Sequence, residues 1–556
     1  MMLLGNINAI PFRRRFGGGS GVPFPYIPGM IARWSAKGLT NEDMSTNPVW
    51  KDLMGNGYDL QMKNFGWAGM SGVNGYVENF NQWFVGLDES NKTVSDSSMK
   101  LVLLESDSQK VIYDKTAHQI GYTYNFYIKV TGIEGRTLNV NAGTLGGTIM
   151  SITEDGIYSI NATVSDSWGN NMLYLIFPPS SSSNTVTIDQ LPLYPGFILG
   201  DGVDDFAVTE KELNFEDTYT VYTAFIPFQD DPARDMILCG KNETKDFSIN
   251  YSGTHINFQP STGVNLVPRI NQFMLLVCKR NKDTTTIINL FTGESRSLSS
   301  KEFIANPGLY YLWRNVHATF LARAAIAGQT ICNGHFSTDE EDEKVLNYYK
   351  QEYPWLFPDQ AWTVVGKTNE DEDRATITNI TGNGNDLVLS NFGFAKGSGY
   401  NEEGEYAGYL VTDGVDDKVQ SSSLTMNEDW TIVGDWELLS NVQINCGIVK
   451  AQNVYLYNIA NGLLISINNP RSLQSFGTKS LHAICSDGRL YDRNWVEYEY
   501  TADQNFAIVK SSLNIGFNLN NYTQIAFKNL GIYNNQILSK DDCIKAYNYL
   551  QTLKAK

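Results

Sequence analysis

The sequence predicts an all-β protein made of two related two-sheet sandwiches, the first of which is interrupted by a smaller β-sandwich. Three observations predict this class: an internal repeat, stretches of alternating apolar and polar residues, and an unusual composition. Glycine occurs 48 times and tyrosine 30 times in 556 residues, whereas charged residues make up only 18%. Aromatic residues favour strands and glycine favours tight turns, so this composition is typical of a strand-rich protein.

A series of short motifs occurs twice in the same order. Residues 38–76 and 366–400 share the pattern G-x-TNED, then GNG-x-DL, then NFG followed by an aromatic residue and alanine. Thr40 and Thr368 occupy the same place in this pattern and lie 328 residues apart. Motifs that recur in order at a nearly constant spacing indicate a duplicated module.

The next shared motif indicates an insertion in the first copy. DGVDD occurs at residues 201–205 and again at 413–417, an offset of 212 residues. Gly55 and Gly382, in the preceding GNG motifs, are 327 residues apart, so the first copy holds 115 residues that the second lacks. We expect residues 77–189 to form a separate body inside the first module.

Periodicity predicts the individual elements. Residues 219–225 and 430–436 alternate between apolar and polar side chains at matching places of the two copies, as half-buried strands do. Residues 124–130 alternate as well, so the insert is predicted to be a small sandwich of its own. Each copy ends with one predicted helix, at about 338–352 and 540–553, behind an acidic N-cap signal.

The chain is therefore predicted to contain four parts. These are an N-terminal anchoring arm (1–30), a discontinuous first sandwich (31–76 and 190–353), an inserted sandwich (77–189) and a second sandwich (354–556).

The first 30 residues differ from the rest. They are rich in glycine and proline and carry the only clearly basic stretch of an acidic chain. Because they lack periodicity, we expect them to become ordered only on a partner. The predicted anchoring residues are Phe12, Arg13, Arg14, Arg15 and Phe16. These arginines follow a short apolar stretch, whereas a secretion signal places its charges first, so we expect synthesis in a host cytoplasm without a signal peptide.

Charge and cysteine content exclude several classes of function. The net charge of −18 at pH 7 repels phosphate backbones, so no nucleic-acid partner is expected. The sequence has no apolar run of about 18 residues, so no membrane insertion is expected. Its six cysteines include no CxxC pair, which argues against both a disulfide scaffold and a zinc site.

The TNED, GNG-x-DL, NFG and DGVDD series with its closing helix resembles concanavalin A-like (laminin-G-like) jelly-roll domains. In particular, it is similar to those of head-fibre or tail-fibre virion proteins from crAss-like and related phages of gut Bacteroidales. The resemblance covers most of the chain outside the insert, and the insert resembles a carbohydrate-binding-module sandwich. Membership would imply packed antiparallel sheets and a host-attachment or decorating role. The family has no universal active site, so no catalytic residue is implied.

The two DGVDD motifs are candidate metal sites. Calcium prefers six to eight oxygen ligands, and each motif supplies three carboxylates. The alternative is a tight turn, in which glycine adopts positive φ and aspartate side chains bond the local backbone. Both interpretations stay open for the residues concerned, which are Asp201, Asp204, Asp205, Asp413, Asp416 and Asp417. No other cofactor is expected.

Aromatic residues of the insert are candidate sugar platforms, because a ring can stack on the apolar face of a pyranose. Trp168 is the preferred candidate, since it lies in a polar stretch that resembles a loop. The other candidates are Tyr122, Tyr124, Tyr127, Tyr158 and Tyr174. No catalytic constellation is recognisable, because the five histidines are scattered and no E-x-D-x-E pattern lies on a predicted strand.

The expected function is that of a non-enzymatic phage virion appendage, either a head or a tail fibre or decoration protein. It would be anchored to other virion proteins by the arm, would bind host surface carbohydrate, and would form a homo-oligomer. The alternatives are a polysaccharide-degrading enzyme on the virion and a secreted bacterial adhesin. The sequence does not distinguish head from tail or identify a glycan.

Overall fold

The computed structural model describes residues 22–555 apart from short gaps. The gaps are residues 106, 144–146, 169, 229–235, 242–246, 260–264, 301–302, 304–306, 315–320, 405, 423, 440–445, 452–453, 460–461, 468–473, 477–480, 500–508, 512, 516, 519–520 and 523. The predicted anchoring residues Phe12, Arg13, Arg14, Arg15 and Phe16 lie outside the described part.

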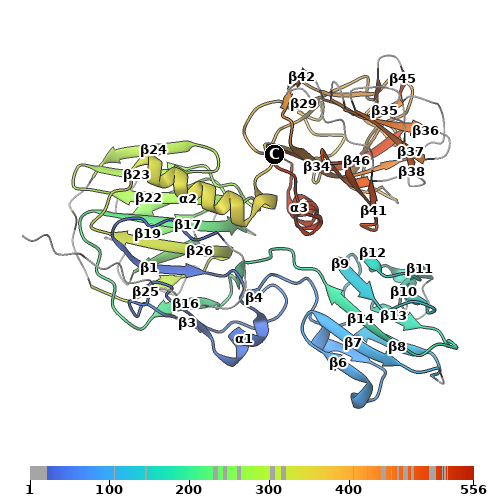
Figure 1. The fold of residues 1–556 in the computed structure, drawn as a ribbon, viewed down its shortest axis with the longest axis horizontal. Coiled ribbons are helices and arrows are strands. Elements are labelled where there is room, and N and C mark those ends of the chain that lie inside the picture. The colour runs from blue at the N-terminus through green and yellow to red at the C-terminus, as the bar shows by residue number, and fades with distance from the viewer. Residues whose placement is uncertain are drawn as a thin grey trace, which may run out of the picture.

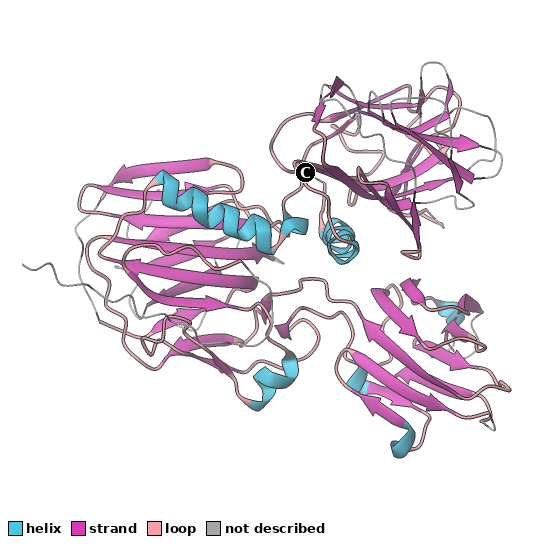
Figure 2. Ribbon diagram, viewed as in Figure 1, coloured by secondary structure: helices cyan, strands magenta, loops and turns pink. Residues whose placement is uncertain are grey.

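The predicted all-β fold class is confirmed, since strands form nearly all of the regular structure (Figures 1 and 2). The described residues include only three α-helices, which are α1 (Asn41–Thr46), α2 (Asp339–Glu352) and α3 (Lys540–Thr552). None of these helices is long and apolar enough to cross a membrane.

The first module consists of two eight-stranded antiparallel sheets. One has the order β24 (Glu294–Ser299), β23 (Thr284–Asn289), β22 (Met274–Arg280), β17 (Tyr219–Pro227), β26 (Arg323–Asn333), β15 (Ile198–Asp201) and β4 (Gly72–Val73), with β1 (Met30–Ser35) also paired to β26. The other has the order β2 (Val49–Trp50), β3 (Leu60–Lys63), β16 (Phe206–Thr209), β25 (Tyr310–Leu312), β18 (Met236–Lys241), β19 (Ser248–Tyr251), β20 (Ile256–Gln259) and β21 (Asn265–Leu266).

The second module repeats this strand order. Its first sheet is β30 (Gly399–Asn401), β31 (Tyr409–Val411), β46 (Ile525–Asn534), β34 (Trp430–Leu438), β39 (Leu481–Cys485), β40 (Arg489–Asp492) and β41 (Glu497–Glu499), with β27 (Gln360–Thr363) on β46. Its second sheet is β28 (Thr376–Ile377), β29 (Leu387–Ser390), β32 (Lys418–Ser421), β43 (Leu513–Ile515), β35 (Cys446–Ala451), β36 (Val454–Ile459), β37 (Gly462–Ile467) and β38 (Gln474–Phe476). Short pairs β33 (Leu424–Met426) with β42 (Val509–Ser511) and β44 (Phe517–Asn518) with β45 (Asn521–Tyr522) flank these sheets.

Residues between the two parts of the first module build a pair of five-stranded sheets. One is β11 (Thr148–Ile152), β10 (Leu138–Ala142), β13 (Leu173–Phe177), β8 (Lys110–Asp114) and β5 (Trp83–Val85). The other is β12 (Gly156–Thr163), β9 (Thr123–Thr131), β14 (Asn184–Gln190), β7 (Ser98–Leu103) and β6 (Lys92–Val94). The alternation predicted for residues 124–130 is visible in β9, where Tyr124, Phe126, Ile128 and Val130 are buried in the core.

The closing helices are capped as their sequences predict. The side chain of Thr338 accepts a hydrogen bond from the amide of Glu341, and the Glu341 side chain accepts one from the amide of Thr338, which completes a capping box at α2. Ser539 caps α3 by accepting a hydrogen bond from the amide of Asp542.

Helix α3 lies where the modules meet, whereas α2 runs along a sheet of the first module (Figure 1). Side chains of α2 and α3 share one buried cluster with strands of all three bodies. For example, the hydroxyl of Tyr549 on α3 accepts a hydrogen bond of 3.0 Å from the backbone amide of Phe273 in the first module. The second module is therefore held against the first by buried contacts as well as by the chain that links them.

Candidate functional site

The two DGVDD motifs form equivalent turns. In the first, Oδ1 of Asp201 accepts hydrogen bonds from the amides of Val203 and Asp204, and Oδ2 of Asp205 accepts from the amide of Asp201 and the hydroxyl of Ser71. Burial raises the pKa of Asp205 to about 7. These contacts are those of a turn whose aspartates bond the local backbone.

The second motif repeats this geometry with its own residues. Oδ1 of Asp413 accepts from the amides of Val415 and Asp416, while Asp417 accepts from the amide of Asp413 and the hydroxyl of Ser398. Burial raises the pKa of Asp417 to about 6.

The carboxylates of each turn are also close enough to hold a metal ion. In both groups, one carboxylate oxygen from each of the three aspartates lies within 4.8 Å of the other two. However, the buried aspartates already accept hydrogen bonds from the backbone and from a serine, and a carboxyl group with a raised pKa is a weaker ligand at neutral pH. Apart from Oδ1 of Asp205, which is buried without a hydrogen-bond partner among the described residues, the local contacts account for the buried aspartates without an ion.

The preferred aromatic candidate of the insert is corrected by the structure. Trp168 is only 4% exposed and its ring stacks on Tyr124 inside the core of the insert. The polar residues around it suggested a loop on the surface, but Asp166–Trp168 form a 3-10 helix and the indole is buried. Trp168 therefore cannot offer a ring face to a sugar.

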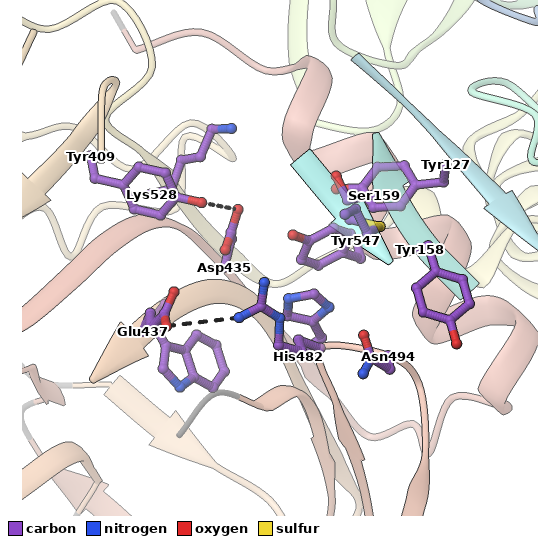
Figure 3. Close-up of a pocket in the computed structure, with 13 residues that line it drawn as sticks. Tyr127, Tyr158, Ser159, Tyr409, Asp435, Glu437, His482, Asn494, Lys528 and Tyr547 are labelled. Atoms are coloured by element: carbon purple, nitrogen blue, oxygen red, sulfur yellow. Dashed lines mark hydrogen bonds and ion pairs between the residues drawn. The ribbon is translucent and has the colours of Figure 1, made fainter. Parts of the chain in front are cut away.

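Two other tyrosines of the same candidate set line a cavity between the insert and the second module (Figure 3). We call it the junction cavity, and its volume is about 140 Å³. Tyr127 and Tyr158 come from β9 and β12 of the insert. The remaining lining residues are Met150, Ser159, Tyr409, Asp435, Trp436, Glu437, His482, Arg493, Asn494, Lys528 and Tyr547.

Aromatic contacts build the floor of the junction cavity. The ring of His482 stacks on Tyr547 at a centroid distance of 4.1 Å, and Tyr127 meets the same tyrosine edge-on at 5.6 Å. All three side chains are buried. Burial lowers the pKa of His482 to about 4, so its imidazole is neutral at pH 7.

Asp435 supplies a fixed carboxylate beside this floor. Its Oδ2 accepts hydrogen bonds from the hydroxyl of Tyr409, at 2.9 Å, and from the side-chain amide of Gln551, at 3.1 Å. Burial, followed by the charge of Asp435, raises the pKa of Tyr127, Tyr409 and Tyr547 above the ordinary range of tyrosine. The hydroxyl groups of this cavity therefore stay protonated and can donate hydrogen bonds at neutral pH.

The rim of the cavity is polar and accessible. A guanidinium nitrogen of Arg493 lies 3.8 Å from a carboxylate oxygen of Glu437, and the Arg493 side chain is 60% exposed. Asn494 is exposed next to it, and Tyr158 is partly exposed on the opposite side (Figure 3). An ion pair this long and this solvated is weak, so a ligand can replace it at little cost.

Sequence reasoning identified Tyr127 and Tyr158 as candidates but missed the residues of the second module. Asp435, His482 and Tyr547 lie on three separate elements, and their sequence neighbours form no motif. The one available signal was the outward position of Tyr127 and Lys129 on a strand whose alternate residues are core. A bulky aromatic residue on that outer face indicates a contact with another body.

No protein-family model and no curated protein matches this chain. Among solved structures, the receptor-binding domain of botulinum neurotoxin mosaic serotype C/D is 10% identical, covering 62% of this chain and 89% of that chain, with a TM-score of 0.27. The botulinum neurotoxin serotype D binding domain is 9% identical over 62% of this chain and 88% of that chain, with a TM-score of 0.28. The Ca²⁺-bound exoplasmic/lumenal domain of VIP36 is 7% identical over 26% of this chain and 82% of that chain, with a TM-score of 0.19. Likenesses this distant assign neither a ligand nor a reaction to the chain.

Proposed function

We propose that this protein is a structural appendage of a phage virion, a head or tail fibre or decoration protein, that binds host surface glycans through the junction cavity. The arm of residues 1–30 would attach it to other virion proteins, and the assembled form would be a homo-oligomer. The observation that carries the glycan-binding part is the chemistry of the junction cavity, where protonated tyrosines, a fixed carboxylate and exposed planar polar groups converge.

Those groups match the surface of a sugar. A pyranose presents hydroxyl groups that both donate and accept, which suits the carboxylates of Asp435 and Glu437, the amide of Asn494 and the guanidinium of Arg493. Its apolar face suits a partly exposed aromatic ring such as Tyr158. The cavity is small, at about 140 Å³, and its rim is open to solvent, so it suits one terminal sugar at the rim rather than a long chain segment.

The virion part of the proposal is supported by different features. The motifs shared by the two modules resemble those of phage fibre proteins, and the arm combines three arginines with glycines and prolines in an otherwise acidic chain. The described end of the arm already rests on the first module, because Phe24 packs against Tyr348 of α2 at a centroid distance of 4.8 Å and Ile27 is buried. We therefore assign the proposed contact with other virion proteins to residues 1–21 of the arm.

A glycan array with the full-length protein tests the binding part. We expect binding to a subset of bacterial surface glycans, and we expect Arg493→Ala and Tyr158→Ala each to weaken it at least tenfold. Arg296→Ala is a matched control, since Arg296 is exposed on β24 of the first module, far along the chain from the cavity. Equal binding by all variants would place the glycan elsewhere, and release of reducing sugar by purified protein would make the protein an enzyme.

Deletion of residues 1–21 tests the virion part separately. The truncated chain should keep its glycan binding and its melting temperature but should be missing from purified particles. A truncated chain that still enters particles would contradict the anchoring role of the arm. Light scattering of the full-length protein would in turn contradict the homo-oligomer if it reported a monomer at micromolar concentration.

A further inference from the structure

A second cavity lies where the insert joins the first module, and nothing in the proposed function uses it. Its volume is about 330 Å³. The first module contributes the backbone around Ala68 and Gly69, and the insert contributes the rest of the wall. We call it the acidic cavity, and its other lining residues are Val77, Glu78, Asn79, Gln82, Trp83, Asp114, Thr116, His118 and Tyr122.

Asp114 is a fully bonded carboxylate in this wall. It is only 3% exposed. Its Oδ1 accepts a hydrogen bond from the amide of Thr116, and its Oδ2 lies 2.8 Å from Nε2 of His118 and accepts from the hydroxyl of Tyr124 at 3.1 Å. Three partners hold this group in place, so it acts as a fixed negative charge.

Glu78 is a second buried carboxyl group with fewer partners. It is 6% exposed, and the hydroxyl of Tyr122 donates a hydrogen bond of 3.2 Å to its Oε1. Burial, followed by repulsion from Asp114, raises the pKa of Glu78 to about 7. Its backbone is held firmly, because the side-chain amide of Gln190 bonds both its amide and its carbonyl.

The charge in this wall is not balanced. Among the lining residues, neither lysine nor arginine occurs, and His118 is the one basic side chain. Burying two acidic groups beside a single histidine is costly unless a further cation can approach. The ring pair of Tyr122 and His118, stacked at 3.7 Å, also lines the wall, and aromatic faces attract cations. Trp83 is buried in the core of the insert and hydrogen bonds to Glu78.

We propose that the acidic cavity binds the ammonium group of a small organic amine, with Glu78 as its principal ligand and Asp114 as the second negative charge. An ammonium group supplies up to three donors and one positive charge, which favours the ionised form of Glu78 at this site. A neutral ligand of the same shape would leave the carboxyl groups uncompensated. The site is independent of the junction cavity, so either can exist without the other.

Isothermal titration calorimetry of the full-length protein with 1,4-diaminobutane and with glucosamine at pH 7 tests this assignment. We expect at least one of the two amines to bind, and which one binds separates an aliphatic amine from an amino sugar. 1,4-Butanediol, a neutral analogue of the diamine, should not bind. Glu78→Gln should weaken amine binding at least tenfold, whereas Glu134→Gln, at an exposed carboxylate of the insert, should leave it unchanged.

Proton release supplies a readout that a folding defect does not mimic. With 1,4-diaminobutane at pH 6, binding should release about one proton from Glu78, and the release should vanish at pH 8.5, where Glu78 is already ionised. The groups that face Glu78 are Asp114, Tyr122 and His118. No heat with either amine at 10 mM, equal binding of 1,4-butanediol, or wild-type amine affinity in folded Glu78→Gln would each overturn the proposal.

Discussion

The side-chain amide of Gln190 hydrogen bonds to both backbone groups of Glu78, accepting from its amide and donating to its carbonyl at 2.9 Å each. Both residues are buried and 112 positions apart, at the two ends of the insert. This contact joins the two ends of the insert where the chain leaves and re-enters the first module. One side chain therefore links the segments at which the pair of five-stranded sheets begins and ends.

Replacing Gln190 by alanine should loosen this closure. The variant leaves two buried backbone groups of Glu78 without partners, which typically costs about 1–3 kcal/mol. We expect Gln190→Ala to lower the calorimetric melting temperature and to speed amide exchange in β7 and β14 first. Gln119→Ala, at an exposed glutamine of the insert, is the control; equal effects of the two variants would show that Gln190 has no special role.

The carboxyl group of Glu78 should make the insert less stable at alkaline pH. Its pKa is about 7 when folded and 4.5 when unfolded, so folding favours the protonated form. Stability should therefore fall as the pH rises from about 4.5 through 7, by up to roughly 3 kcal/mol. Glu78→Gln should remove this decline and be the more stable protein at pH 8. If denaturant titrations show that the free energy of unfolding changes with pH equally in both proteins between pH 4 and 8, the effect does not come from burial of Glu78.

His482 should have the opposite effect in the acid range. Burial lowers its pKa from 6.5 to about 4, with Asp435 opposing the shift and Arg493 adding to it. The unfolded chain takes up the proton first, so the stability that this group contributes is present above pH 6.5 and is lost as the pH falls to about 4. Selective histidine labelling and NMR should show one imidazole that titrates near pH 4, and His482→Gln should remove that signal. A titration near 6.5 would contradict the packing of the junction.

Calcium should leave the DGVDD turns unchanged. A site saturated a hundredfold above its dissociation constant would add about 2.7 kcal/mol to the free energy of unfolding. For modules of this size that corresponds to several degrees of melting temperature. We expect 1 mM CaCl₂ and 1 mM EDTA to give the same melting curve. A rise with calcium that disappears in the double variant Asp205→Asn, Asp417→Asn would instead establish a calcium site.

The duplicated architecture could be predicted because its motifs are local and strict. Asn41 and Asn369, in the two TNED motifs, accept equivalent hydrogen bonds from the amides of Val73 and Tyr400. At the same places Gly72 and Gly399 adopt φ near +150°, and a Cβ there would approach the asparagine oxygen to 2.6 and 2.5 Å. Only glycine can adopt this φ and leave room for the asparagine oxygen. Both copies therefore keep the glycine and the asparagine at the same spacing, which makes the repeat recognisable in the sequence.

The candidate site was not predictable in the same way. The junction cavity joins Tyr127 with Tyr547, which lie in different bodies and meet only because β9 and α3 dock. Docking of preformed bodies depends on surface shape, which leaves no periodic signal in either segment. The same limitation explains why Trp168 was wrongly predicted to be a surface platform. Its neighbours in the sequence are polar, as in a loop, but its ring packs in the core of the insert.

A crystal structure of the full-length protein with a bound oligosaccharide from the glycan array tests the central claim most directly. The account predicts a terminal sugar in the junction cavity, with its apolar face on Tyr158 and its hydroxyl groups bonded to Asp435, Arg493 or Asn494. Sugar density at any other surface, with the junction cavity left to water at saturating ligand, would contradict it.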